Sequence, residues 1–548
     1  MAERKAAQME AEYVIIGAGS AGCVLANRLT EDGKSSVVLL EAGGDDRPLK
    51  ELSQFSSNIN IHLPAGFTRM LNDGKVNWNY RTEPDPGTND RVHAFPRGKV
   101  LGGSSSINGM IYVRGLTQDY DGWRQLGCEG WSWESVLPYF KRIENQVGRD
   151  AGVAGVGGPL DVVDTSMRHP VSTAIIAAFE QAGVPRAADL NGNTQEGVSY
   201  TRLNQKHGRR HSAAVAYLHP AMKRPNLRVE TRAFVQRVVF EGTKAVGVEY
   251  ARGGEVFILR AQREVIVSGG AINSPQLLEL SGIGQPELLG GMGIGVVAAV
   301  PGVGENLQDH YASMVRARMK PGSPSMNDLS RGIGLVGQIL KYLATRDGLL
   351  ALGGSHITAF LRSVPEQDLP DLQFFSSPAT VDFQGLAMNG KMAMEPKPGL
   401  TIGGYVMRPQ SRGTIHARSR DPREYPVIRP NFLQAEADQI GSIAALRWAR
   451  KIMRQPALAP YFDHELTPGD GAESHEELLA FIRMGGSTGY HQTSTCAMGS
   501  VVDSQLRVNG VQNLRVVDAS IMPRMVSGNT HAATVMIAEK ASDMIRGV

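Results

Sequence analysis

The sequence predicts an α/β fold in which one domain is assembled from separate segments of the chain and a second, sheet-based domain lies between them. A strand–turn–helix–strand pattern begins at residue 13, similar patterns return after residue 485, and the stretch from about 315 to 480 differs in character. Glycine accounts for 63 of the 548 residues, well above the usual share of about 7%. These glycines fall in short clusters between apolar runs, where backbone turns tightly or approaches another group closely.

The N-terminal pattern is that of a βαβ unit. The apolar run 13–16 is rich in β-branched residues and predicts a buried strand. The segment Gly17-Ala18-Gly19-Ser20-Ala21-Gly22 follows it, then a helical stretch over 23–29 and a second apolar run, 37–40, that ends at Glu41. Continuous apolar strands joined by a helix are typical of parallel strands buried on both faces.

The glycine spacing in this unit, Gly-x-Gly-x-x-Gly, is typical of a dinucleotide site. Gly17 permits the tight turn, Gly19 lets the backbone approach a pyrophosphate, and Gly22 lets the helix pack closely on the strand. The phosphates would meet unpaired N–H groups at the helix N-terminus. Glu41 is placed to accept hydrogen bonds from ribose hydroxyls and disfavours a 2′-phosphate. The motif alone does not distinguish FAD from NAD.

A Pro-, Gly- and Ser-rich loop is expected over residues 84–106, and further elements are expected after it. They are strands over 227–249 and 264–268, a helix from near Ser274, a helix over 335–345, a strand over 401–406, a strand over 514–517 and a helix over 534–545.

Composition excludes several classes of protein. The net charge is +3 without a dense Lys/Arg block, so a nucleic acid partner is not expected. Three scattered cysteines, Cys23, Cys128 and Cys496, form neither a disulfide framework nor a metal-binding spacing, so no metal is predicted. The N-terminus lacks the apolar stretch of a secretory signal, and no run of about 18 apolar residues predicts a membrane span. We therefore expect a cytoplasmic protein without a transmembrane anchor.

Four longer motifs resemble those of the glucose–methanol–choline (GMC) flavoprotein oxidoreductases. They are residues 96–109 (PRGKVLGGSSSING), 270–284 (GAINSPQLLELSGIG), 302–310 (GVGENLQDH) and 516–523 (VVDASIMP). The resemblance spans residues 12 to 546, is weakest from about 315 to 480, and looks most like the choline dehydrogenase-like members.

The resemblance implies the GMC fold, with a discontinuous Rossmann-like FAD-binding domain and a sheet-based substrate-binding domain. The first would comprise residues 1–160, 197–314 and 485–548, and the second residues 161–196 and 315–484. FAD would be non-covalent, because Ile107 stands where some members carry the histidine that tethers the flavin. The residues that the motifs and the resemblance together assign to the cofactor are Gly17, Gly19, Ser20, Ala21, Gly22, Glu41, Ala42, Val100, Gly102, Gly103, Ser104, Asn108, Gly109, Val235, Ser268, Gly269, Asp518, Ala519, His531, Ala532 and Thr534.

Two histidines match catalytic positions of the family. His491 matches the active-site base, although Gln492 and the pair Thr493-Ser494 replace the family's common Pro and Val-Gly. His531 stands where choline-type members have Asn, and where glucose oxidase and aryl-alcohol oxidase have His, which weakens choline as a substrate. Alcohol oxidation by hydride transfer to flavin N5 needs a base for the hydroxyl proton, and neutral imidazole suits that task. We expect His491 to be the base and His531 to hydrogen-bond the alcohol oxygen, with the division of roles left open.

The predicted reaction is oxidation of an alcohol, aromatic or aliphatic and most simply primary, to the aldehyde, with electrons passed to oxygen or a quinone-type acceptor. Tyr490, Phe374 and Phe375 are candidates for the substrate pocket. Two alternatives remain open from the sequence: a hydroxynitrile lyase on the same scaffold and a flavoprotein without catalysis. The alcohol, the acceptor and the oligomeric state are also open.

Overall fold

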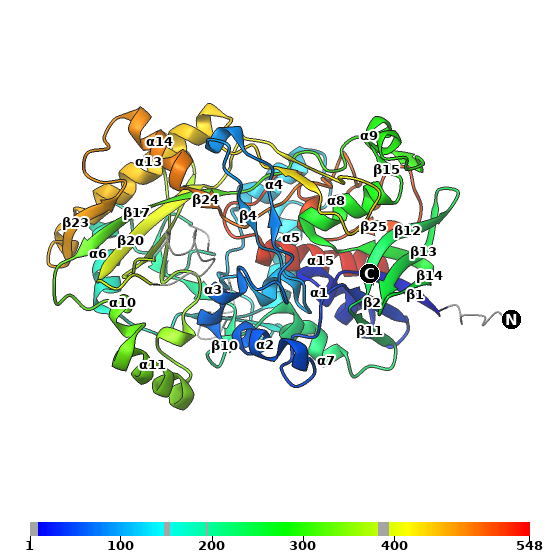
Figure 1. Cartoon of the computed structure of the whole chain (residues 1–548), viewed down its shortest axis with the longest axis horizontal. Helices are drawn as coiled ribbons and strands as arrows, with labels where there is room; N and C mark the ends of the chain where they lie inside the picture. The colour runs from blue at the N-terminus through cyan, green and yellow to red at the C-terminus, as the bar shows by residue number, and fades with distance from the viewer. Residues whose placement is uncertain (1–8, 147–153, 193–194, 382–393, 548) are drawn as a thin grey trace.

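The structure, a computed structural model, describes residues 9–146, 154–192, 195–381 and 394–547. Figure 1 shows two sheets at opposite ends of the molecule, with loops and short helices between them. The helices are α1 (Ser20–Leu29), α2 (Phe55–His62), α3 (Phe67–Met70), α4 (Thr117–Gln125), α5 (Trp133–Ile143), α6 (Pro170–Gln181), α7 (His219–Ala221), α8 (Gly270–Leu280), α9 (Pro286–Gly291), α10 (Met326–Leu329), α11 (Gly332–Thr345), α13 (Glu436–Met453), α14 (His475–Gly485) and α15 (His531–Arg546).

The first sheet has a parallel core that contains the predicted βαβ unit. Its order is β11-β2-β1-β14-β13-β12, and β25 pairs with β14. β1, β2, β11 and β25 run parallel to their neighbours, whereas β12 and β13 form an antiparallel extension. The strands are β1 (Met9–Ile16), β2 (Val37–Glu41), β11 (Leu227–Thr231), β12 (Phe234–Glu241), β13 (Lys244–Arg252), β14 (Glu255–Val267) and β25 (Leu514–Val516).

The second sheet is antiparallel and lies at the other end of the molecule. Its order is β23-β17-β20-β19-β18-β7, and β24 pairs with β17. α13 packs against β17 and β20. The helix and the sheet share an apolar core that includes Ile402 of β20 and Leu446 of α13. The strands are β7 (Gly197–Tyr200), β17 (Tyr311–Met319), β18 (Ile357–Leu361), β19 (Leu372–Ser377), β20 (Gly399–Val406), β23 (Phe462–Thr467) and β24 (Ser487–Thr488).

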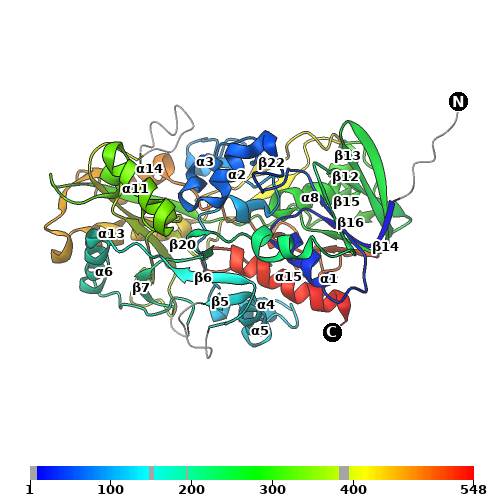
Figure 2. The ribbon, with the colours of Figure 1, turned by 90° about the horizontal axis from the view of Figure 1, so that it is seen from below.

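The C-terminal helix returns to the first helix of the chain. α15 packs along α1, and the ribbon in Figure 2 shows the red C-terminal helix beside the blue N-terminal one. Glu539 is completely buried between them and accepts hydrogen bonds from Arg28 (Nε to Oε2, 3.0 Å) and from the Tyr217 hydroxyl (2.8 Å). This packing places the first residue of α15, His531, at the glycine-rich start of α1.

The elements expected from the sequence are largely confirmed, with shifted ends. The expected helix over 335–345 is α11, which begins three residues earlier, at Gly332, and the strand over 401–406 is β20. The helix expected from near Ser274 begins at Gly270, directly after the strand. β7, residues 197–200, pairs with β18 in the second sheet, although the sequence assigned residues from 197 onward to the first domain. The division into two domains stays a prediction.

The described ranges show neither a membrane-spanning helix nor a metal-binding cluster. None of the helices there is both long enough and apolar enough to cross a membrane. The same residues contain no group of three or more His, Cys, Asp or Glu side chains that could hold a metal ion. The cytoplasmic location expected from the sequence stays a prediction.

The contact between α1 and β1 leads to the first prediction. A Cβ on Gly22 would lie 1.9 Å from the carbonyl oxygen of Gly17, so Gly22→Ala forces the helix away from the strand. We expect the free energy of unfolding to fall by about 3 kcal/mol, measured by thermal and chemical denaturation. Gly122→Ala in α4, where a Cβ meets open space, is the matched control. Equal stability of the two variants would contradict the close contact.

Candidate active site

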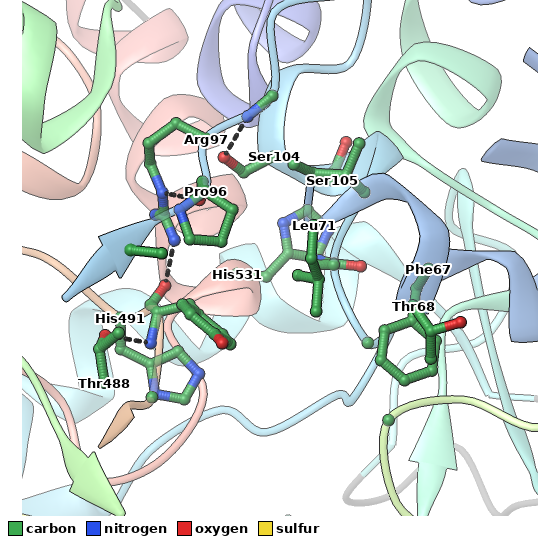
Figure 3. A pocket seen from close by; sticks show the side chains of 18 of the residues that line it. Phe67, Thr68, Leu71, Pro96, Arg97, Ser104, Ser105, Thr488, His491 and His531 are labelled. Atoms are coloured by element: carbon green, nitrogen blue, oxygen red, sulfur yellow. Dashed lines mark hydrogen bonds between the residues drawn. The ribbon is translucent and has the colours of Figure 1, made fainter. Parts of the chain in front are cut away.

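One large cavity of about 1780 Å³ lies between the two sheets. Its wall runs from Glu41 and Val235 at the first sheet, past the turn that contains Gly19, to Phe375 and Tyr405 on the second sheet. Figure 3 shows part of this cavity, with His491 and His531 approaching it from different sides. The same cavity wall therefore contains both the predicted dinucleotide site and the predicted catalytic residues.

The two glycine-rich loops meet in this cavity. Gly17 has φ +96°, and a Cβ on it would lie 2.6 Å from the carbonyl oxygen of Ser268. Gly103 has φ +51°, and a Cβ there would lie 2.7 Å from the Cα of Gly19. Gly19 is the N-cap residue of α1, and no side chain in the described part of the chain caps this helix end. The N-terminus of α1 therefore lines the cavity with backbone N–H groups that suit an anionic phosphate.

Polar side chains around these loops fit the ribose and phosphate parts of a dinucleotide. Glu41 lines the cavity while its carboxylate accepts from the backbone N–H groups of Ala18 (2.9 Å) and Gly43 (2.8 Å), and burial raises its pKa to about 7. Asp518 accepts from the N–H of Gly270 (2.8 Å) and fixes the start of α8. The buried Ser268 hydroxyl has no partner among the described residues, as expected for a group that meets a ligand.

Most of the residues predicted for the cofactor line this one cavity. They are Gly17, Gly19, Ser20, Ala21, Glu41, Ala42, Gly103, Ser104, Asn108, Gly109, Val235, Ser268, Gly269, Asp518, Ala519, His531 and Thr534. Four predicted residues are not in the cavity wall. Val100 and Ala532 are buried. Gly22 packs on Gly17, and Gly102 donates its N–H to the carbonyl of Ala18. The residues present therefore fit a bound dinucleotide.

His491 is held at both ring nitrogens. Its Nδ1 lies 2.9 Å from Nδ1 of His310, and its Nε2 lies 3.0 Å from the side-chain nitrogen of Asn529. The other nitrogen of His310, Nε2, lies 2.8 Å from the carbonyl oxygen of Met407. Burial lowers the pKa of His310 to about 3, and burial together with His310 and Arg97 lowers the pKa of His491 well below its usual value. Both rings are therefore neutral near pH 7.

The hydrogen bonds assign a single tautomer to each ring. A carbonyl oxygen only accepts, so His310 carries its proton on Nε2 and its Nδ1 is an acceptor. His491 must then carry its proton on Nδ1 and donate it to His310. This leaves a lone pair on Nε2 of His491, where the Asn529 amide donates. The atom with the lone pair is the one a general base needs.

A second series of bonds orients Asn529. Its carbonyl oxygen accepts from Nε2 of Gln373 (3.0 Å), and the Gln373 carbonyl accepts from the Tyr405 hydroxyl. The Tyr405 ring also stacks on His310, with ring centroids 4.1 Å apart. Tyr405 therefore supports both partners of His491, one by its hydroxyl and the other by its ring.

Asp309 and Arg97 fix the backbone around His491. The Asp309 carboxylate accepts from the backbone N–H of His491 (2.8 Å) and from the side chain of Gln492 (2.7 Å), and burial raises its pKa to about 6. Gln492, which departs from the family pattern, thus holds this carboxylate. Arg97 donates to the carbonyl of Tyr490 (2.6 Å), as the dashed line in Figure 3 shows. His491 is positioned through its main chain as well as its ring.

His531 lies on the other side of the cavity. Its Nδ1 is 3.1 Å from the hydroxyl of Ser20 in the glycine-rich turn, and burial together with Arg210 lowers its pKa to about 4. No described contact joins it to His491. In the same segment it is Asn529, two positions earlier, that contacts His491, and the sequence did not single it out. Asn529 and His531 stand in the same short segment, Gly528-Asn529-Thr530-His531. Nothing in the sequence of that segment shows which of the two side chains points toward His491.

Of the three residues predicted for the substrate pocket, two line the cavity and one does not. Phe375 and Tyr490 line the cavity. Phe374 is completely buried in the core of the second sheet, where its ring contacts Phe179 with centroids 6.0 Å apart. Adjacent residues of a strand point to opposite faces, so only one of the two phenylalanines can face the cavity. The expectation for Phe374 is therefore corrected.

Comparisons with known proteins agree with this geometry. Residues 11–312 and 409–538 match the N- and C-terminal parts of the GMC oxidoreductases. The chain is 44% identical to mitochondrial choline dehydrogenase of Mus musculus, covering 98% of this chain and 90% of the relative. It is 41% identical to oxygen-dependent choline dehydrogenase of Sinorhizobium fredii, covering 98% and 96%. The chain belongs to the GMC oxidoreductase family. It is an FAD-dependent alcohol oxidoreductase, as the sequence predicted.

Solved structures of GMC oxidoreductases share this fold. The crystal structure of pyridoxine 4-oxidase from Mesorbium loti superposes with a TM-score of 0.86 at 31% identity and covers 98% of this chain and 99% of that one. A formate oxidase structure superposes with a TM-score of 0.89 at 24% identity, covering 98% of each chain. The α/β fold predicted from the sequence is confirmed for this GMC oxidoreductase.

The tautomer of His491 leads to the second prediction. His310→Phe keeps a ring over Tyr405 but removes the acceptor for Nδ1 of His491, so the ring no longer holds its lone pair on Nε2. We expect anaerobic flavin reduction by an alcohol to slow by about 100-fold, measured by stopped-flow absorbance. Tyr311→Phe, at the neighbouring position, is the control because it leaves both His491 bonds intact. A rate unchanged by His310→Phe would show that His310 does not set the tautomer.

Proposed function

We propose that this GMC oxidoreductase oxidises a neutral primary alcohol with an apolar body, and that His491 takes the hydroxyl proton at Nε2. The bound FAD supplies the hydride acceptor, its N5 atom. The observation that carries the proposal is the lone pair on Nε2 of His491, which the hydrogen bonds of His310 and Met407 dictate. A flavoprotein without catalysis has no need of a base held in one tautomer. The oxidoreductases among the relatives favour alcohol oxidation over the hydroxynitrile lyase alternative.

Asn529 is proposed as the partner of the base. Its amide nitrogen already donates at Nε2 of His491, so a hydroxyl group bound there lies within reach of the same donor. Such a donor stabilises the negative charge that develops on the alcohol oxygen as the proton leaves. His531, predicted for this role, lies against Ser20 of the glycine-rich turn. We propose that His531 acts from the cofactor side of the cavity.

Non-covalent binding of FAD remains our proposal. Ile107, at the position where some family members carry the tethering histidine, has 4% of its surface exposed and packs in a small apolar cluster with Val100 and Ile61. An aliphatic side chain cannot form a bond to the flavin, so the cavity wall holds the cofactor by shape and hydrogen bonds. FAD released into the supernatant by acid precipitation supports this, whereas a flavin that stays with the protein contradicts it.

The proposed substrate is neutral because the described cavity wall has no carboxylate near the base to pair with a cation. The acidic residues in that wall are Glu41 and Asp518, both in the cofactor part, whereas Arg97 lies beside His491. Near the base the wall is aromatic, with Phe375, Tyr405 and Tyr490. Choline, the substrate in the names of the relatives, carries a quaternary ammonium that a nearby arginine disfavours.

The third prediction concerns substrate charge. Choline and its neutral isostere 3,3-dimethylbutan-1-ol differ only in the charged nitrogen, so their comparison isolates electrostatics. We expect the neutral alcohol, and benzyl alcohol, to give kcat/KM at least about tenfold above that of choline. Anaerobic flavin bleaching measures the first step, and peroxide formed in air separates oxygen from a quinone-type acceptor. A preference for choline would refute the proposed substrate, and bleaching by none of the alcohols would refute alcohol oxidation.

The fourth prediction tests the base. His491→Ala removes the imidazole that carries the Nε2 lone pair, and we expect flavin reduction to fall by about 10³-fold. FAD content should stay unchanged, because His491 is held by Asp309 through its main chain. His464→Ala is the matched control, since that histidine is exposed on β23. If His491→Ala reduces flavin at the wild-type rate at saturating alcohol, His491 is not the base.

The fifth prediction follows from the lowered pKa of His491. A base with an ordinary imidazole pKa loses half its activity at about pH 6.5. His491 stays unprotonated well below this value, so the flavin reduction rate should be flat from about pH 8 to about pH 6.5. Asp309 titrates at about 6, and Asp309→Asn separates its contribution. A midpoint of 6.5 or higher that survives in Asp309→Asn would contradict the assignment.

A further inference from the structure

Helix α11 has an apolar face that no element of the described ranges covers. Along its outer side Ile333 is 92% exposed, Val336 56%, Leu340 62% and Leu343 61%. The spacing i, i+3, i+7 and i+10 places these side chains on one face of the helix. The opposite side holds the helix to the protein through Tyr342, which is buried and donates its hydroxyl to the carbonyl of Gly208 (3.0 Å).

A second apolar stripe lies before and along helix α2. Leu49 is 82% exposed, Leu52 71%, Phe55 43% and Ile59 46%. The two short helices that connect these regions to the cavity, residues 64–66 after α2 and residues 349–351 after α11, pack against each other. Figure 1 shows α2 and α11 along the lower edge of the molecule, and Figure 2 shows both from below. The two stripes therefore belong to the same side of the protein.

This side also borders the active-site cavity. Leu335 and Ile339 of α11 line the cavity, as do Asn60 and Leu63 at the end of α2. Scattered exposed apolar residues are normal on a protein surface, but two helical stripes beside one cavity are not scattered.

The charges near α11 are mainly positive. Arg331, Lys341 and Arg346 lie on the helix or at its ends, and the acidic residues of the stretch 326–347 are Asp328 and Asp347. Asp347 pairs with Lys341 at 3.2 Å. The hairpin that Tyr342 contacts, residues 205–210, adds the exposed Arg209 and Lys206, of which Lys206 pairs with Asp161 at 3.6 Å.

We propose that this side, defined by α11, α2 and the 205–210 hairpin, docks on an anionic lipid surface. An outward apolar face flanked by basic side chains is the pattern of helices that lie in a membrane interface without crossing it. Basic side chains are attracted to anionic headgroups while the apolar side chains enter the acyl boundary. A second copy of the chain fits less well, because a twofold contact over this face would bring its basic residues against their own copies. Docking would bring the cavity wall formed by α11 to the lipid.

Vesicle co-sedimentation of the full-length FAD-loaded protein tests the proposal. We expect binding to vesicles of phosphatidylcholine with phosphatidylglycerol, weakened by salt, and little binding to phosphatidylcholine alone. The variant Ile333→Ser/Leu340→Ser/Leu343→Ser should lose about tenfold or more of the partition coefficient. A charge variant, Arg209→Gln/Lys341→Gln/Arg346→Gln, should lose binding to anionic vesicles to a similar degree.

Matched controls keep the experiment decisive. Val256→Ser/Ile258→Ser removes two side chains that are 58% and 49% exposed on β14, in the first sheet, and should bind vesicles like the wild type. Thermal stability, FAD content and turnover of a water-soluble alcohol should be unchanged in every variant. Absence of wild-type binding, or equal loss in the β14 control, overturns the proposal. So does sedimentation velocity that shows a wild-type dimer converted to monomer by the α11 variant without any vesicle binding.

Discussion

The packing of α15 on α1 is the contact on which the site depends. The two helices lie at opposite ends of the chain, and the buried carboxylate of Glu539 binds Arg28 and Tyr217 between them. A buried carboxylate is stable only when it is paired and hydrogen-bonded, so this contact fixes the register of the helices. The register sets His531 against Ser20 and places the preceding Asn529 at His491. The glycine-rich turn and the proposed base are thus joined by one segment.

The neighbourhood of His491 illustrates how burial and hydrogen bonding cooperate. Burial alone would leave two neutral imidazoles without defined tautomers. The Met407 carbonyl removes that freedom at His310, and His310 removes it at His491. The same rings lie beside Tyr405, whose hydroxyl orients the amide chain through Gln373. The tautomer that the proposed base needs is therefore set before substrate binds, and a substrate hydroxyl has only to displace the Asn529 N–H from Nε2 of His491.

The sequence was informative where function requires a fixed backbone pattern. The βαβ unit and the glycine turn follow from the local motif, because its three glycines meet three distinct packing needs. The cavity positions of Ser268 and Ala519 came from the family resemblance. His310, Asn529, Gln373 and Tyr405 could not be assigned, because they come from four distant segments that only the second sheet and the C-terminal segment bring together. Phe374 was misplaced because alternation along a strand decides which neighbour faces the cavity, and its register depends on the partner strands.

The Met407 carbonyl has a further consequence for proton traffic. Because Nε2 of His310 already donates to that oxygen, His310 cannot pass a proton onward into the protein. A proton taken by His491 is therefore shared at most with the adjacent imidazole, and the interior behind it is a closed end. In the proposed reaction the proton therefore has to leave through the cavity, by the same route through which the alcohol enters.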